Sequence, residues 1–258
     1  MENYTEMNAK AIDKWVEGGW EWGIPITTEV YVAAKSGAWD VLLTPTKPVP
    51  HNWFAPYIKN NRLDGAKLLG LASGGGQQMP VFAALGAECT VLDYSDRQLE
   101  SERMVAAREG YAISIVKADM TQRLPFEDDS FDIIFHPVSN CYVENVYHVW
   151  NECFRILKKG GILLAGMDNG MNFIIDDVTA RPMKITGMLP FNPLKNPKQM
   201  KQFSDLDGSF QFSHTLEEQI GGQLKAGFKL TDVYEDFSND SDAIADGIPF
   251  YWASRTVK

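Results

Sequence analysis

A run of small residues at positions 70–78, Gly-Leu-Ala-Ser-Gly-Gly-Gly-Gln-Gln, has the composition of a ligand-binding turn. It follows the apolar residues of a short predicted strand and precedes a segment that is typical of a helix. Glycine lets the backbone approach another group closely, because it carries no side chain. The turn is therefore predicted to bring bare backbone next to a nucleotide-type ligand or next to another part of the chain.

Two common nucleotide-binding motifs fit this turn poorly. A Walker loop has a Lys directly after its last glycine, but Gln77 follows Gly76 here. A dinucleotide fingerprint has a third glycine at the position of Met79, so Gly74 and Gly76 complete only its first half. An NAD(P)-binding oxidoreductase is thereby disfavoured, although it stays open as an alternative.

Acidic residues end the next two predicted strands. Asp93 lies 17 residues after Gly76, where a carboxylate can accept hydrogen bonds from a ribose diol. Its other reading is a cap for the helix that begins near Ser95. Asp119 can accept from the exocyclic amine of an adenine while Met120 packs on the ring, and an acid at this position is not part of the dinucleotide pattern.

Short apolar segments alternate with helical patterns from residue 66 onward. This alternation predicts an α/β fold, a doubly wound sheet of seven mostly parallel strands with helices on both faces. The last two strands are joined by a short polar segment, so the final strand is expected to be antiparallel. The predicted strands cover residues 67–72, 89–94, 113–119, 131–137, 161–168, 228–237 and 249–257, and the main helices cover 77–87, 95–110, 143–161 and 215–228.

Two segments lie outside the alternation. Residues 1–62 hold five of the seven tryptophans and are predicted to form an N-terminal helical cap or lid. Residues 63–258 then form the main domain. Residues 168–213 are rich in Asn, Pro and Lys and are predicted to be a functional insertion in that domain.

The order of these motifs resembles the class I S-adenosylmethionine-dependent methyltransferases over residues 66–166. The glycine turn lies over the family's glycine motif, and VLDYSDRQL resembles its acidic second-strand end. KADMTQRLPFEDDSFDIIF resembles its third-strand segment, and RILKKGGILLA its signature before the fifth strand. Two positions depart from the pattern, since Gly70 replaces the usual acidic residue and Ala72 the usual first glycine.

The resemblance implies S-adenosylmethionine as cofactor and a small molecule as methyl acceptor. Because the motif's acidic residue is missing, Ser73, Gln77 and Gln78 are candidates to replace it. The cofactor-binding residues that the resemblance implies are Ala72, Ser73, Gly74, Gly76, Gln77, Asp93, Tyr94, Gln98, Asp119, Met120 and His136. Two of them have alternatives, since His136 can be a hydrogen-bonded histidine near the core and Asp119 a turn residue.

The acceptor is expected to bind near residues 136–146, after the fourth strand. Asn140 and Tyr142 can present polar groups there or pack in the loop, and Cys141 is expected to be a buried structural thiol. No general base or other catalytic residue is identified. A non-catalytic cofactor-binding protein of the same fold therefore remains a second alternative.

Bulk properties narrow the partners. The 258 residues carry a formal net charge of −10, which disfavours nucleic acid as a partner. No apolar run approaches the ~20 residues of a membrane helix, and we expect no secretory signal. Three cysteines without C-x-x-C spacing predict a reducing cytoplasm and no metal site.

Overall fold

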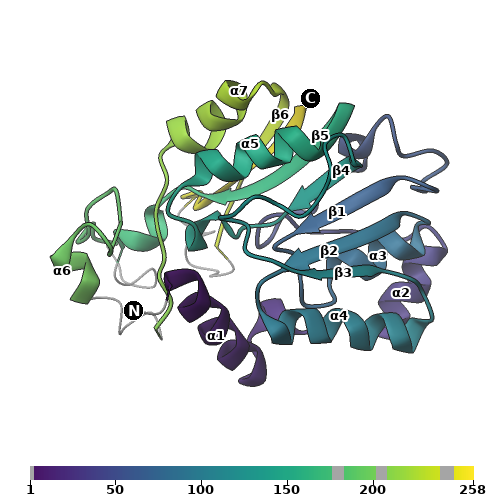
Figure 1. Cartoon of the computed structure of the whole chain (residues 1–258), viewed down its shortest axis with the longest axis horizontal. Helices are drawn as coiled ribbons and strands as arrows, with labels where there is room; N and C mark the ends of the chain where they lie inside the picture. The colour runs from purple at the N-terminus through teal and green to yellow at the C-terminus, as the bar shows by residue number, and fades with distance from the viewer. Residues whose placement is uncertain (1–2, 176–182, 202–207, 239–246) are drawn as a thin grey trace.

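The computed structural model describes residues 3–175, 183–201, 208–238 and 247–258, and its seven strands form one sheet (Figure 1). The strand order is β3-β2-β1-β4-β5-β7-β6. The strands are β1 (Lys67–Leu71), β2 (Glu88–Asp93), β3 (Ser114–Lys117), β4 (Phe131–His136), β5 (Leu157–Asp168), β6 (Lys229–Asp236) and β7 (Tyr251–Val257).

The first five strands are parallel, and β7 is antiparallel to both β5 and β6. The predicted seven-stranded α/β sheet and its antiparallel last strand are confirmed. In the sheet, β2 and β3 lie on one side of β1, and β4 lies on its other side. The carboxyl ends of β1 and β4 therefore flank the switch point at which open sheets of this kind bind ligands.

Helices cover both faces of the sheet (Figure 1). Helices α2 (Thr28–Lys35), α3 (Gln78–Ala84) and α4 (Asp96–Glu109) pack on one face, and α5 (Val146–Ile156) and α7 (Gly222–Ala226) on the other. Ser95 is the N-cap of α4, since its hydroxyl accepts a 3.1 Å hydrogen bond from the Gln98 amide. A π-helical turn, η6 (Glu217–Gly221), leads into α7, which ends at Gly227 with φ +113° as the Gly stop predicts.

The predicted helix over 143–161 is wrong at its carboxyl end. The helix stops at Ile156, and Leu157 already belongs to β5, opposite Phe131 of β4. The Gly160 amide then bonds to the carbonyl of Lys258 at 2.9 Å. Pairing with β4 and with the chain's last residue therefore prevails over the local helix-stop pattern of Lys-Lys-Gly-Gly.

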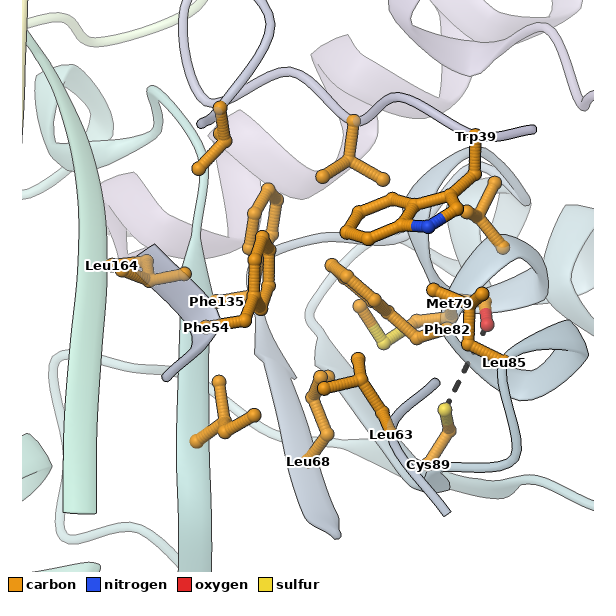
Figure 2. Close-up of a cluster of buried hydrophobic side chains, with 14 of the residues drawn as sticks. Trp39, Phe54, Leu63, Leu68, Met79, Phe82, Leu85, Cys89, Phe135 and Leu164 are labelled. Carbon is orange, nitrogen blue, oxygen red and sulfur yellow. Dashed lines mark hydrogen bonds between the residues drawn. The ribbon is translucent and has the colours of Figure 1, made fainter. Parts of the chain in front are cut away.

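The two parts of the N-terminal segment lie in different places. Helix α1 (Tyr4–Glu17) and the 3-10 turn η1 (Glu21–Gly23) lie beyond the carboxyl ends of the strands (Figure 1). The chain from α2 to the 3-10 turn η2 (His51–Phe54) packs into the core instead. Figure 2 shows Trp39 and Phe54 among side chains of the central strands and α3, such as Phe82 and Phe135.

The described residues between β5 and η6, together with the loop before α5, form three short elements. These are the 3-10 turn η4 (Met171–Phe173) and α6 (Pro197–Met200), and before α5 the 3-10 turn η3 (Asn140–Tyr142). Residues 176–182 and 202–207 of the predicted insertion lie outside the described residues.

Candidate active site

A cavity of about 290 Å³ lies at the carboxyl ends of the parallel strands. Helix α1 and the turn after it cover the cavity with Thr5, Asn8, Trp20 and Trp22. The strand ends and the loops that follow them supply Ala72, Gly74, Asp93, Tyr94, Asp119, Met120, Val138, Tyr142 and Asp168.

Asp93 is buried at the end of β2 and lines the cavity. Its Oδ2 accepts from the Gly74 amide and its Oδ1 from the Ser95 amide, both at 3.0 Å. Burial raises the pKa of this carboxyl, while those amide hydrogen bonds lower it. A carboxylate oxygen accepts more than one hydrogen bond, so Asp93 can still receive hydroxyl groups from a ligand.

The three consecutive glycines of the turn direct their amides into the protein. The Gly75 amide donates to the carbonyl of Gln98 at 3.0 Å, and the Gly76 amide to Oε1 of Glu102 at 2.8 Å. A Cβ on Gly74 would lie 2.6 Å from the Cβ of Gln98. The bare backbone therefore allows close packing on α4, and only Gly74 of the three lines the cavity.

Ala72 occupies the position at which the turn first becomes left-handed. Its φ is +47°, a region that favours glycine, and its amide donates to the carbonyl of Leu92 at 2.8 Å. The chain thus keeps the backbone shape of the glycine motif although the residue is alanine.

Residues 21–26 form hydrogen bonds with the end of the glycine turn, at Gly76 and Gln77. The Ile26 amide donates to the carbonyl of Gly76 at 3.0 Å. The Gln77 side-chain amide donates to the carbonyls of Glu21 and Ile24 at 2.9 and 3.0 Å. We call these three hydrogen bonds the N-terminal latch, and sequence patterns gave no signal for it.

Asp119 and Met120 line the cavity after β3, as does Tyr94 after β2. The Oδ1 of Asp119 accepts a 2.8 Å hydrogen bond from the Thr121 amide. Gln98 reaches the cavity from α4 and donates from Nε2 to the carbonyl of Trp22 at 3.4 Å. Its buried Oε1 has no hydrogen-bond partner among the described residues.

Three of the predicted site residues do not line the cavity. Ser73 is buried and donates to Oε1 of Gln78 at 3.0 Å, and Gly76 faces α4. The fully buried His136 bonds through Nδ1 to the carbonyl of Leu71 at 2.8 Å and through Nε2 to Oδ1 of Asn140 at 2.9 Å. Burial lowers the pKa of His136, while these two hydrogen bonds raise it. A neutral ring has a single N–H, which can donate to only one of the two oxygens. The bond to the Leu71 carbonyl ties β4 to β1.

Asp168 is a cavity residue that sequence reasoning missed. It ends β5, is 2% exposed, and accepts from the Gly170 amide through Oδ1 at 3.0 Å. Its Oδ2 has no hydrogen-bond partner among the described residues. Burial raises the pKa of Asp168 to about 6. The signal was an acid at the end of a predicted strand, the same signal that identified Asp93.

The cavity is acidic. Its described lining includes Asp93, Asp119 and Asp168 and contains no Lys, Arg or His. Beside Asp168, burial raises the pKa of both the Cys141 thiol and the Tyr142 hydroxyl, so neither group supplies an anion near neutral pH.

Comparisons with known proteins identify the family of the chain. Residues 69–165 match the model of a methyltransferase domain. An uncharacterized methyltransferase, YbaJ of Bacillus subtilis, is 44% identical over 255 residues, which is 97% of either chain. The chain belongs to the class I S-adenosylmethionine-dependent methyltransferases.

More distant relatives share the methyltransferase's core or its fold. A sterol 24-C-methyltransferase of Aspergillus fumigatus is 32% identical over 102 residues, which is 38% of this chain and 27% of that protein. The crystal structure of an S-adenosylmethionine-dependent methyltransferase from Mesorhizobium loti covers 81% of this chain and 98% of its own, with a TM-score of 0.62 and 17% identity. The first relative shares part of the chain and the second shows the fold.

Membership of this methyltransferase family decides between the functions that the sequence left open. The protein is an enzyme, and the family uses S-adenosylmethionine as methyl donor. The oxidoreductase and the non-catalytic protein are therefore set aside. Within the described residues, every helix is too short or too polar to cross a membrane.

Proposed function

We propose that this methyltransferase binds S-adenosylmethionine in the cavity and transfers its methyl group to a small molecule bound beside it. The observation that carries the proposal is that one cavity is lined both by Asp93 and Asp119 and by Asp168. The cofactor half and the acceptor half of the site are thereby continuous. A concave cavity lined by apolar side chains and a few polar groups is the usual form of a small-molecule site.

The residues present fit the cofactor. Asp93 holds the ribose hydroxyls, and Asp119 accepts from the adenine amine while Met120 packs on the ring. Gln98 offers the cofactor a further hydrogen-bond acceptor, because its buried Oε1 has no hydrogen-bond partner among the described residues. The proposed direct contacts are those that line the cavity, namely Ala72, Gly74, Gln77, Asp93, Tyr94, Gln98, Asp119 and Met120.

Ser73, Gly76 and His136 take an indirect part in this proposal. Each is held by hydrogen bonds to other parts of the protein and stands behind the cavity wall. We therefore assign them to shaping the glycine turn and the end of β4.

The bound cofactor supplies a methyl group that is already activated for displacement. The protein has to align the acceptor with that group and keep water out. Trp20 and Trp22 serve the second task, since they cover the cavity from the N-terminal side. The cytoplasm is the proposed location, and nucleic acid remains disfavoured as a partner by the net charge of −10.

Calorimetry with S-adenosylmethionine tests the cofactor site. Asp93→Asn keeps the side chain's shape but removes the charge and replaces one of the two accepting oxygens by an NH2 group, which only donates. A charge-assisted hydrogen bond contributes roughly 1.5–3 kcal/mol. We expect the affinity to fall at least ~10-fold. Asp96→Asn is the control, because the exposed Asp96 pairs with Lys117 and does not line the cavity. An unchanged affinity in a folded Asp93→Asn variant contradicts the assignment.

A further inference from the structure

The carboxylate of Asp168 lies in the part of the cavity that we propose for the methyl acceptor, and one of its oxygens accepts no hydrogen bond from the described residues. Across the sheet Asp168 stands opposite Tyr251 of β7. Its Oδ1 is satisfied by the Gly170 amide, whereas Oδ2 is unpaired among the described residues. Burying a charged oxygen without a hydrogen bond costs free energy, so we expect a ligand to donate a hydrogen bond to this oxygen.

The side chains around Asp168 do not neutralise it. Tyr142 and Tyr251 also line the cavity, and burial raises the pKa of both, that of Tyr251 to about 12. The Tyr251 hydroxyl already receives a 3.1 Å hydrogen bond from Asn172. The hydroxyl of Thr5, which reaches the cavity from α1, is buried and unpaired within the described part of the chain.

The other two acids of the cavity differ from Asp168 in one respect. Both oxygens of Asp93 accept backbone amides, and Asp119 accepts one from Thr121. Both have a task in the proposed cofactor site. Asp168 alone of the three combines deep burial with an unpaired oxygen and no such task.

We infer that the methyl acceptor is a small amine, whose nitrogen donates a hydrogen bond to Oδ2 of Asp168 and is methylated there. This inference rests on the proposed function. An acceptor bearing a carboxylate or a phosphate at this point would be repelled, because the described lining offers it three acids and no cationic side chain. Tyr142, Tyr251 and Phe173 give the amine's apolar part a surface to pack on.

The reaction balances with Asp168 as proton acceptor. The lone pair of the neutral amine attacks the methyl carbon, so a C–N bond forms while the S–C bond breaks and its electron pair stays on sulfur. The nitrogen becomes positively charged and still carries its protons. Asp168 stabilises this charge, accepts one proton on Oδ2 and returns it to solvent after the methylated amine leaves.

Binding to matched probes tests the inference without knowledge of the natural acceptor. The probes are benzylamine, benzyl alcohol and benzoate, together with butylamine, butanol and butyrate, each measured by ligand-detected NMR in the presence of saturating S-adenosylhomocysteine. We expect the amine of each series to bind at least 10-fold more tightly than its alcohol or carboxylate. In Asp168→Asn, which can still accept from Gly170, this preference should disappear.

The matched control is Asp232→Asn, an exposed aspartate on β6, which should keep the amine preference. Affinity for S-adenosylhomocysteine is measured in the same samples and should stay within 3-fold of the wild-type value in both variants. Equal or absent amine binding in the wild type, or an amine preference that survives in Asp168→Asn, overturns the inference. Loss of S-adenosylhomocysteine binding in the wild type would instead contradict the proposed function itself.

Discussion

The backbone amide of Gly76 donates a 2.8 Å hydrogen bond to Oε1 of Glu102, a fully buried carboxyl beneath the glycine turn. Its Oε2 has no partner among the described residues. Burial, and secondarily the negative charge of Asp93, raise the pKa of Glu102 to about 8, against the opposing effect of the Gly76 hydrogen bond. Glu102 is therefore mostly protonated near neutral pH and must ionise in a buried place as the pH rises further.

Glu102→Gln should make folding stability less dependent on pH. The folded pKa lies above the ordinary value of about 4.5, so the wild type binds more protons folded than unfolded between about pH 4.5 and 8. The contribution of Glu102 to stability is highest below that window and falls as the pH rises through it, by up to about 5 kcal/mol. Glutamine can still accept from Gly76 but does not ionise, so this fall should be absent.

Urea denaturation at pH 5.5, 7 and 8.5 measures this difference. Glu100→Gln on the same helix is the control, because the exposed Glu100 pairs with Arg103 and should contribute less than ~1 kcal/mol. Parallel pH profiles for the wild type and Glu102→Gln would show that Glu102 ionises without cost.

Ala72→Gly should stabilise the protein. Alanine at φ +47° carries a steric cost of roughly 1–2 kcal/mol, and glycine carries none. Part of the gain is offset because glycine has more freedom in the unfolded chain. We expect a net increase of about 0.5–1 kcal/mol in the free energy of unfolding, measured by chemical denaturation at constant pH.

A second alanine-to-glycine change should alter the free energy of unfolding in the opposite direction. Ala84 is buried in α3, where glycine loses both helix propensity and packing, so Ala84→Gly should destabilise by about 1 kcal/mol or more. If Ala72→Gly is also destabilising, the alanine methyl contributes packing that outweighs the strain of its backbone.

The sequence was informative wherever a pattern is local. Alternating apolar segments predicted the seven strands, and an acid at a strand end singled out Asp93, which lines the cavity. Its contact with a ribose stays a prediction. The end of α5 was mispredicted because β5 is set by pairing with β4 and with Lys258, which are distant in sequence. Local helix-stop residues cannot report such pairing.

Two other features were missed for the same reason. Glu102 looks like an ordinary helix residue until Gly76 is seen to pack on it. The sequence also does not tell which tryptophans of the N-terminal segment pack in the core and which line the cavity. The structure shows that Trp39 packs in the core and that Trp22 lines the cavity. Asp168 is different, since its position at a strand end was visible and only its unpaired oxygen required the structure.

The N-terminal latch should couple the cover of the cavity to the cofactor. Gln77 holds the carbonyls of Glu21 and Ile24, and a Cβ on Gly75 would lie 2.8 Å from the carbonyl oxygen of Trp22. We propose that this stretch, together with α1, acts as a lid whose closure excludes water from the methyl group. Saturating S-adenosylmethionine should therefore slow hydrogen exchange in residues 10–26 as well as in the glycine turn.

Gln77→Ala removes two hydrogen bonds of the latch and leaves the Ile26–Gly76 hydrogen bond in place. Exchange in residues 18–26 of the free variant should rise by about 5-fold or more, since each of the two lost hydrogen bonds contributes ~0.5–1.5 kcal/mol. Arg103→Ala, which removes an exposed ion pair of α4, should leave exchange there unchanged. If cofactor slows exchange in the glycine turn but not in residues 10–26 of the wild type, the N-terminal segment is a fixed wall of the cavity and does not close over the bound cofactor.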